Sequence, residues 1–273
     1  MKFFIDTADI DEINEAYSLG ILDGVTTNPS LIKKAVEKLK EKNEKIEMSS
    51  YIKKILRLTR GTPVSLEVTE TEYDKMVEQA KKLYKMFNPV AFNVCIKIPV
   101  NPAFEGKGNE FDGIKAIKAL AKAKIPVNCT LIFTPEQALV AAKAGARYVS
   151  PFAGRVDDYI RSMNNKEFKK EDYFPSFGWK DGDRMLEDNG IISGIDLVKQ
   201  IAEIFTKFKI KSEIIAASMR NSRQVREAAL AGAHISTMPL YVIKDLLKHY
   251  KTEEGMKKFS ADVVPEYRDI IKK

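Results

Sequence analysis

The sequence has 273 residues, of which 44% are hydrophobic and 30% charged, a balance typical of folded globular chains. The net charge is +7, but lysines and glutamates alternate, as in residues 37–47 (EKLKEKNEKIE), and no basic stripe with interspersed aromatics occurs, so no nucleic-acid partner is expected. No apolar run reaches the ~20 residues that span a bilayer, and Asp6 precedes any signal-peptide core, so no membrane association is expected. Cys95 and Cys129 lie in apolar runs, which predicts no disulfide framework and a cytoplasmic location.

Eight short runs rich in β-branched residues predict strands, at residues 2–6, 24–27, 63–68, 93–99, 126–132, 146–151, 212–218 and 233–237. Longer amphipathic stretches lie between these runs and predict helices, for example over 72–87, 111–123 and 134–145. In the last of these, Thr134 and Pro135 mark the helix start and Gly145 marks its end.

The alternation of strands and helices predicts a parallel sheet, and eight strands predict closure into a single (β/α)8 barrel of the α/β class. A doubly wound open sheet is the alternative, but no Gly-rich dinucleotide turn follows the first strand. No linker or low-complexity tract divides the chain, so residues 1–273 are expected to form one domain.

Two stretches exceed a minimal barrel. Residues 31–60 carry a double helical pattern, and residues 156–190 are polar and aromatic and include Trp179, the only tryptophan. Both are expected to be surface crossovers, with a lid or a subunit contact as the alternative. A helix predicted over 252–272 has no further strand to pack behind, so we expect it to dock on a neighbouring subunit.

Polar side chains occur at the end of every predicted strand. Because the carboxyl ends of parallel strands meet at one mouth of a barrel, these side chains are expected to converge on a site there. They are Asp6, Thr26, Thr27, Asn28, Glu67, Lys97, Asn128, Thr130, Ser150, Ser218 and Thr237.

Lys97 stands out because it lies in the middle of a strand, between Ile96 and Ile98. Burial disfavours a charged ammonium, and a neutral amine can attack a carbonyl carbon. This is the requirement for Schiff-base catalysis. A structural ion pair with Asp6 or Glu67 is the alternative for a buried lysine, and the two roles are compatible.

Asp6 and Glu67 come from different strands, so two carboxylates can serve proton transfer from two sides of one bound carbon chain. A metal site is the competing use of two acids. The only histidines, His234 and His249, match no ligand spacing, which makes the metal site the weaker interpretation.

The segment Ser218-Met219-Arg220-Asn221 follows the seventh strand and opens the next helix. Free N–H groups at a helix start, a hydroxyl and a guanidinium together suit a phosphate group, and Arg155 could complete a two-arginine clamp. Residues 106–110 (GKGNE) lack the spacing of a P-loop and are expected to form a surface turn, with contact between Lys107 and phosphate as the alternative.

These motifs resemble those of the transaldolases, Schiff-base aldolases of the pentose phosphate pathway, over nearly the whole chain. The shared motifs are FIDTADIDEI, GVTTNPSLI, KIPV, NCTLIF, SPFAGR and ASMRN, which include Asp6, Asn28, Lys97, Asn128, Ser150 and Arg220.

The resemblance implies a role for each of these side chains and no organic or metal cofactor. Lys97 would form the Schiff base with C2 of a ketose phosphate, Asp6 would take the C4 hydroxyl proton, and Glu67 and Thr130 would activate water. The dihydroxyacetone unit would be bound by Thr27, Asn28, Asn128, Ser150 and Phe152, and the phosphate by Arg155, Ser218 and Arg220. The substrates would be fructose 6-phosphate or sedoheptulose 7-phosphate with erythrose 4-phosphate or glyceraldehyde 3-phosphate. Homo-oligomers built through the last helix are also implied.

A related branch, fructose-6-phosphate aldolase, releases free dihydroxyacetone and has a tyrosine at the place of Phe152 and a glutamine at the place of Glu67. The present residues favour the transaldolase branch, with the lyase as the alternative. A transaldolase for a sulfonated sugar is a further alternative, because residues 156–190 and the loop at 101–113 depart from the family pattern. A barrel that binds sugar phosphates without catalysis is the third, and it leaves a buried amine beside two acids without a purpose.

Overall fold

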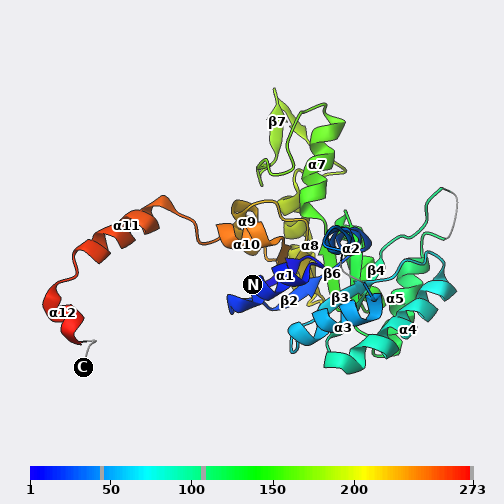
Figure 1. The fold of residues 1–273 in the computed structure, drawn as a ribbon. Coiled ribbons are helices and arrows are strands. Elements are labelled where there is room, and N and C mark those ends of the chain that lie inside the picture. Colours follow the sequence, from blue (N-terminus) through cyan, green and yellow to red (C-terminus); the bar gives the residue numbers. More distant parts are fainter. Residues whose placement is uncertain (44–45, 106–108, 271–273) are drawn as a thin grey trace.

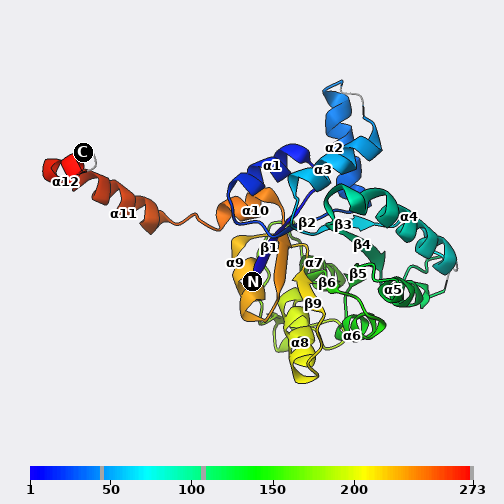
Figure 2. The same cartoon turned by 90° about the horizontal axis from the view of Figure 1, so that it is seen from below.

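Eight parallel strands close into a barrel in the computed structural model, which describes residues 1–43, 46–105 and 109–270. Around the barrel the order is β1-β10-β9-β6-β5-β4-β3-β2, with β1 hydrogen-bonded to both β2 and β10 (Figures 1 and 2). The predicted (β/α)8 barrel is therefore confirmed. The strands are β1 (Lys2–Asp6), β2 (Gly24–Thr26), β3 (Val64–Glu67), β4 (Val94–Pro99), β5 (Val127–Ile132), β6 (Tyr148–Pro151), β9 (Glu213–Ala216) and β10 (Ile235–Met238).

Helices alternate with these strands and surround the barrel (Figure 2). Two helices, α2 and α3, connect β2 to β3, as the double helical pattern of residues 31–60 predicts. The helices are α1 (Ile10–Ser18), α2 (Pro29–Glu41), α3 (Met48–Leu58), α4 (Tyr73–Ala91), α5 (Asp112–Lys122), α6 (Pro135–Ala144), α7 (Ala153–Met163), α8 (Gly194–Lys207), α9 (Ser222–Leu230) and α10 (Leu240–Asp245).

The start and stop signals of α6 act as the sequence predicts. The Thr134 side chain accepts a hydrogen bond from the Gln137 N–H and the Gln137 side chain accepts one from the Thr134 N–H, a reciprocal capping box, with Pro135 in the first turn. Gly145 ends the helix at a φ of 105°, which a residue with a Cβ adopts only with strain. In contrast, α4 continues one turn beyond its predicted end at 87, because Pro89 removes only one N–H from the ladder.

The inside of the barrel changes from apolar to polar along its axis. At the amino ends of the strands, a buried layer of Phe4, Cys95, Tyr148, Ile215 and Ile235 fills the interior. Gly24 belongs to this layer, because a Cβ there would lie 2.6 Å from the Phe4 ring. The next inward positions carry polar side chains, so the apolar layer is the floor beneath a polar mouth.

The segment 156–190 contains more regular structure than a plain crossover. Its first residues continue α7, and β7 (Trp179–Asp181) pairs antiparallel with β8 (Arg184–Leu186) to form a hairpin outside the barrel (Figure 1). The hairpin was not predicted, because its strands are short and mostly exposed and lack an apolar alternation.

The C-terminal region forms two helices, where one was expected over 252–272. α11 (Tyr250–Ala261) and α12 (Pro265–Ile270) are separated before Pro265, because the residue preceding a proline is disfavoured in helical conformation. Residues 271 and 272 of the predicted helix lie outside the described residues. Both helices extend away from the barrel and bury none of their described residues (Figures 1 and 2).

Among the described residues, no helix combines the length and the apolar character needed to cross a bilayer.

Candidate active site

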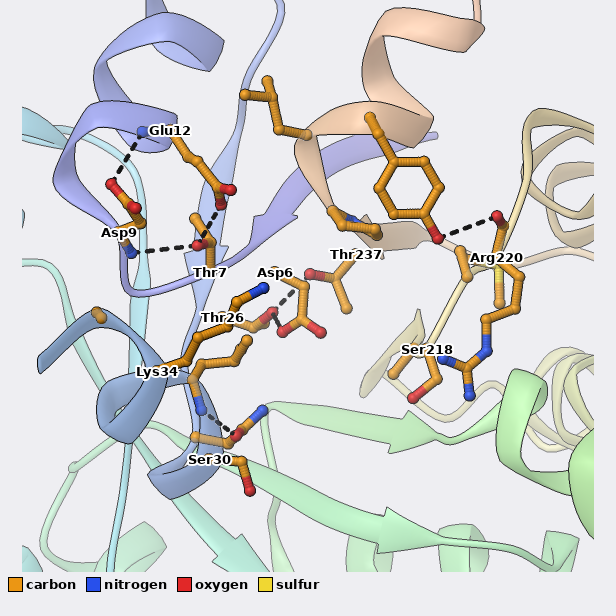
Figure 3. A pocket seen from close by; sticks show the side chains of 18 of the residues that line it. Asp6, Thr7, Asp9, Glu12, Thr26, Ser30, Lys34, Ser218, Arg220 and Thr237 are labelled. Carbon is orange, nitrogen blue, oxygen red and sulfur yellow. Dashed lines mark hydrogen bonds between the residues drawn. The ribbon is translucent and has the colours of Figure 1, made fainter. Parts of the chain in front are cut away.

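A pocket of about 800 Å³ opens at the carboxyl ends of the barrel strands. Ser218 and Arg220 lie on one side of it and Ser30 and Lys34 on the other (Figure 3). Asp6, Thr26 and Thr237 lie between these two sides (Figure 3). Ten predicted polar or aromatic residues line it, namely Asp6, Thr26, Asn28, Lys97, Ser150, Phe152, Arg155, Ser218, Arg220 and Thr237.

Lys97 is a buried cation in this pocket, with 4% of its surface exposed. Its Nζ lies 3.1 Å from Glu67 Oε2 and donates to the Thr27 carbonyl oxygen at 3.1 Å. The pairing follows from register, because Glu67 and Lys97 are directly opposite each other on β3 and β4. The ammonium also lies 5.8 Å from the centre of the Phe152 ring. Lys97 therefore forms the ion pair that the sequence offered as an alternative, with Glu67 as the partner.

Asp6 lies at the end of β1, between the neighbouring strands β2 and β10. Thr26 donates from its hydroxyl to Asp6 Oδ1 at 2.7 Å, and the Thr26 and Thr237 hydroxyls are hydrogen-bonded at 2.6 Å. This chain of hydroxyls fixes the Asp6 carboxylate and leaves its second oxygen to face the pocket (Figure 3).

A second polar chain runs across β3, β5 and β6. The Asn128 amide donates to Ser65 Oγ at 3.1 Å, and the Ser150 hydroxyl donates to Asn128 Oδ1 at 2.6 Å. Asn128 is fully buried, and it therefore orients Ser150, which lines the pocket. Thr130, also fully buried, has a hydroxyl with no hydrogen-bond partner among the described residues.

Thr27 and Asn28 lie where β2 leads into α2. Asn28 caps α2 by accepting the Leu31 N–H at 3.0 Å, and its side chain lines the pocket. The Thr27 hydroxyl donates to the Ser65 carbonyl at 2.7 Å, and Thr27 is not among the residues that line the pocket. It reaches the site through its carbonyl, which accepts from Lys97.

Ser218 and Arg220, two of the residues predicted to bind phosphate, lie where β9 leads into α9, and we call this side of the pocket the anion end after that prediction. Ser218 has a φ of 62°, an uncommon conformation for a residue with a Cβ. Its carbonyl packs against Gly154 of α7 so closely that a Cβ there would lie 2.1 Å away. Arg155 is exposed and its guanidinium stacks 5.0 Å from the centre of the Phe152 ring.

Arg220 is held from three directions. Its Nη2 donates to Asp158 Oδ2 at 2.8 Å, and its backbone N–H donates to Gln224 Oε1 at 2.8 Å. Its carbonyl accepts from the Tyr241 hydroxyl at 3.2 Å (Figure 3). Asp158 of α7 therefore orients the guanidinium, whereas α9 and α10 hold the Arg220 backbone.

Asp157 lies behind Arg220 and is 2% exposed. It accepts from the Gly194 N–H at 2.7 Å and from Gln224 Nε2 at 2.9 Å, and so joins α7, α8 and α9. Burial raises the pKa of its carboxyl to about 7, although the Gly194 hydrogen bond and Arg161 act in the opposite direction.

Several residues of this site were missed by sequence reasoning. Asp157, Asp158 and Gln224 support Arg220. The one signal for them in the sequence was that Asp158 lies one helical turn after Gly154, and therefore on the same face of the helix. Ser30 and Lys34 enter from α2, whose amphipathic pattern does not distinguish a pocket-facing lysine from a solvent-facing one.

Two further expectations concern residues away from the site. Lys107 lies outside the described residues. Neither histidine faces a metal ligand set: His234 accepts from the Ile214 N–H, and His249 caps α11. Within residues 1–43, 46–105 and 109–270, no cluster of three or more potential metal-ligating side chains occurs.

A (β/α)8 barrel with a buried lysine and carboxylates at its mouth defines a class of barrel enzymes. Comparison with known proteins specifies the family. The family model "Transaldolase/Fructose-6-phosphate aldolase" matches residues 3–270. The chain therefore belongs to the transaldolase/fructose-6-phosphate aldolase family and is an enzyme of the transaldolase type.

Relatives support this assignment over almost their whole length. A probable transaldolase of Bacillus cereus is 43% identical over 96% of this chain and 97% of its own. A probable transaldolase of Thermoplasma volcanium is 39% identical over 99% of this chain and 100% of its own. One from Clostridium botulinum is 42% identical over 96% of each chain.

Among solved structures, a putative lactate oxidase of Pediococcus acidilactici aligns with a TM-score of 0.45 and 16% identity, over 87% of this chain and 62% of that one.

Proposed function

We propose that this enzyme transfers a dihydroxyacetone unit from a ketose phosphate to an aldose phosphate through a Schiff base on Lys97. The donor is fructose 6-phosphate or sedoheptulose 7-phosphate, and the acceptor is erythrose 4-phosphate or glyceraldehyde 3-phosphate. The observation that carries the proposal is the buried Lys97 ammonium, 3.1 Å from the Glu67 carboxylate in the barrel mouth.

The first step is formation of the imine. Glu67 takes a proton from Lys97, and the free amine attacks C2 of the ketose. The short distance between Lys97 Nζ and the Glu67 carboxylate supports this proton transfer. The carbinolamine then loses its oxygen as water, which Glu67 and Thr130 position. The Thr27 carbonyl orients the amine during attack.

The second step breaks the C3–C4 bond. Asp6 removes the C4 hydroxyl proton, the bonding electron pair moves into the protonated imine, and the aldose phosphate leaves. The protonated imine is itself the electron sink, so this step requires neither a metal nor an organic cofactor. Thr26 and Thr237 keep Asp6 oriented for the proton transfer.

The remaining steps reverse this chemistry on the acceptor. The enamine carbon attacks the acceptor aldehyde, Asp6 returns its proton to the new hydroxyl, and water releases the product from Lys97. Asn28, Asn128 and Ser150 bind the retained three-carbon unit. Arg155, Ser218 and Arg220 bind the phosphate of donor and acceptor in turn.

Phe152 supports transfer rather than release. Release of free dihydroxyacetone requires protonation of the enamine carbon and hydrolysis before an acceptor arrives. The Phe152 ring stands 5.8 Å from Lys97 Nζ and brings no hydroxyl that would orient water there. The enamine consequently persists until an aldehyde enters.

The proposal extends to the domain organisation, location and oligomeric state of the enzyme. We propose that the 273 residues form one catalytic domain that acts in the cytoplasm, in the pentose phosphate pathway, as a homo-oligomer. The exposed apolar side chains of α11 and α12, among them Phe259 and Ile270, support assembly through these helices.

Acceptor dependence tests the proposed reaction. Glyceraldehyde 3-phosphate release from fructose 6-phosphate is measured with and without erythrose 4-phosphate, with Lys97→Met as the inactive control. Sustained release only with the acceptor supports a transaldolase, and sustained release without it assigns the protein to the lyases. Activity on a sulfonated ketose, with none on fructose 6-phosphate, would replace the proposed substrate.

A further inference from the structure

We propose that Lys170 is a specificity-determining residue that recognises the phosphate group of the sugar substrate from outside the barrel. It lies between α7 and β7, in the segment that exceeds a minimal barrel. The inference rests on the proposed function for the sugar part of the ligand, whereas recognition of the anion by Lys170 is independent of it.

Lys170 and Glu171 line the same pocket as Lys97 and Arg220. They occupy the two central positions of a turn from Lys169 to Asp172. The Asp172 N–H donates to the Lys169 carbonyl at 3.0 Å, and the Lys169 N–H donates to Asp172 Oδ2 at 2.7 Å. These reciprocal bonds define the turn and present Lys170 at its tip.

One side of the turn is anchored to α7. Arg161 is 2% exposed, and its Nη2 donates to the Asp172 carbonyl at 2.9 Å. The Arg161 guanidinium lies 4.9 Å from the centre of the Phe168 ring and 5.0 Å from that of Phe174. A buried arginine between two aromatic rings is a rigid support, so the turn is held at a fixed distance from α7.

The other side is anchored to α9, the helix that begins just after Arg220. The Tyr173 hydroxyl donates to Glu227 Oε1 at 2.7 Å, and the Arg223 guanidinium lies 3.8 Å from the centre of the Tyr173 ring. Lys170 is therefore placed beside the anion end of the pocket, because its turn is attached to the helices on both sides of that end.

The charges at this end determine what each residue contributes. Arg220 already has a carboxylate partner in Asp158, whereas Lys170 forms no ion pair with a carboxylate among the described residues. Its ammonium is thus available to a phosphate. Burial raises the pKa of the Tyr241 hydroxyl, and the charge of Glu171 adds to this rise. Glu171 therefore acts on the same region as Lys170, with the opposite sign.

Four single variants test the proposal. Lys170→Gln is expected to raise the KM for fructose 6-phosphate about fivefold with little change in kcat, since a solvent-facing charge contributes about 1 kcal/mol. Glu171→Gln is expected to lower the KM. Lys169→Gln, in the same turn and not among the residues that line the pocket, is the matched control and is expected to be unchanged. Lys170→Arg is expected to restore the wild-type value.

Binding of inorganic phosphate, measured by titration calorimetry in the absence of turnover, separates this proposal from the proposed function. Weaker phosphate binding in Lys170→Gln alone supports anion recognition even if no transaldolase activity is found. Equal phosphate affinities and equal KM values in the Lys169 and Lys170 variants would overturn the proposal and leave the transaldolase reaction standing. Weaker binding in both Lys170→Gln and Glu171→Gln would also overturn it, because it would indicate disruption of the turn.

Discussion

Lys97 and Glu67 form a buried ion pair, and such pairs seldom add stability, because removing two charges from water offsets their attraction. Two apolar residues of similar size would serve packing as well. The pair is easier to explain by chemistry, since a carboxylate in contact with the ammonium can accept its proton and return it.

Replacing Glu67 with glutamine tests this proton transfer. Glu67→Gln keeps the shape of the side chain but cannot accept the lysine proton, so the rate of imine formation is expected to fall by about 10²-fold. Borohydride trapping during a single turnover measures that rate. Glu70→Gln, an exposed position just beyond β3, is the control. Trapping of Glu67→Gln at the wild-type rate would exclude Glu67 as the base.

Phe152 governs the fate of the enamine. Phe152→Tyr adds a hydroxyl near Lys97, which is expected to orient water and increase the release of free dihydroxyacetone without an acceptor. Phe133→Tyr alters the ring that packs 5.9 Å from Phe152, between ring centres, and serves as the control. If dihydroxyacetone release in Phe152→Tyr stays at the level of the control, Phe152 does not separate transfer from release.

The sequence predicted the polar residues at the strand ends of the mouth but not the residues that support Arg220. Lys97 and Glu67 were identifiable because a charged residue within an apolar strand is exceptional. Asp157 and Gln224 lie in amphipathic helices, where a polar residue normally faces solvent, and only the packing of three helices buries them. Local patterns cannot report a contact that tertiary structure creates.

At the scale of elements, α7, α8 and α9 meet at Asp157 behind the anion end. The pKa of this carboxyl is raised to about 7, chiefly by burial. In the unfolded chain its pKa returns to about 3.9. At a pH between these two pKa values, the Asp157 carboxyl is protonated in the folded state and ionised in the unfolded state. The stability that Asp157 contributes therefore declines as pH rises from about 4 to 7.

The variant Asp157→Asn is expected to remove this decline. Relative to wild type, its free energy of unfolding should rise by up to about 4 kcal/mol between pH 4 and 7, because one pKa unit corresponds to about 1.4 kcal/mol. Lost hydrogen bonding to Gln224 adds a constant offset. Urea unfolding over a pH series measures the difference, with the exposed Asp183→Asn as control. Parallel pH profiles for Asp157→Asn and wild type would contradict a raised pKa.

Barrel elements were predictable because their signals are local. Each strand is a β-branched run, and helix ends such as Thr134 and Gly145 carry their own capping chemistry. The hairpin of β7 and β8 has only six residues in its strands, most of them exposed, so hydrophobic periodicity gives no signal.

At the scale of the whole molecule, the C-terminal helices extend away from the barrel (Figure 1). Their apolar side chains are exposed. Phe259 is 68% exposed and Ile270 71%, on helices that bury none of their described residues. Exposed apolar surface on this scale is typical of an interface, and it supports the proposed homo-oligomer.

Removing residues 249–273 is expected to yield a monomer whose barrel remains folded, because α11 and α12 contribute nothing to the barrel core. Light scattering coupled to size exclusion measures the mass. Phe259→Asp is expected to weaken assembly, whereas Phe208→Asp, at a position 66% exposed after α8, is the control. An unchanged oligomer after the deletion would show that assembly uses another surface.

The central claim is that Lys97 forms a covalent imine with a ketose phosphate. Borohydride reduction in the presence of fructose 6-phosphate, followed by peptide mass analysis, tests it most directly. The account predicts one added group, a reduced sugar adduct, on the peptide containing Lys97, and none in Lys97→Met. A label on another lysine, or no label in an enzyme that turns over fructose 6-phosphate, would contradict it.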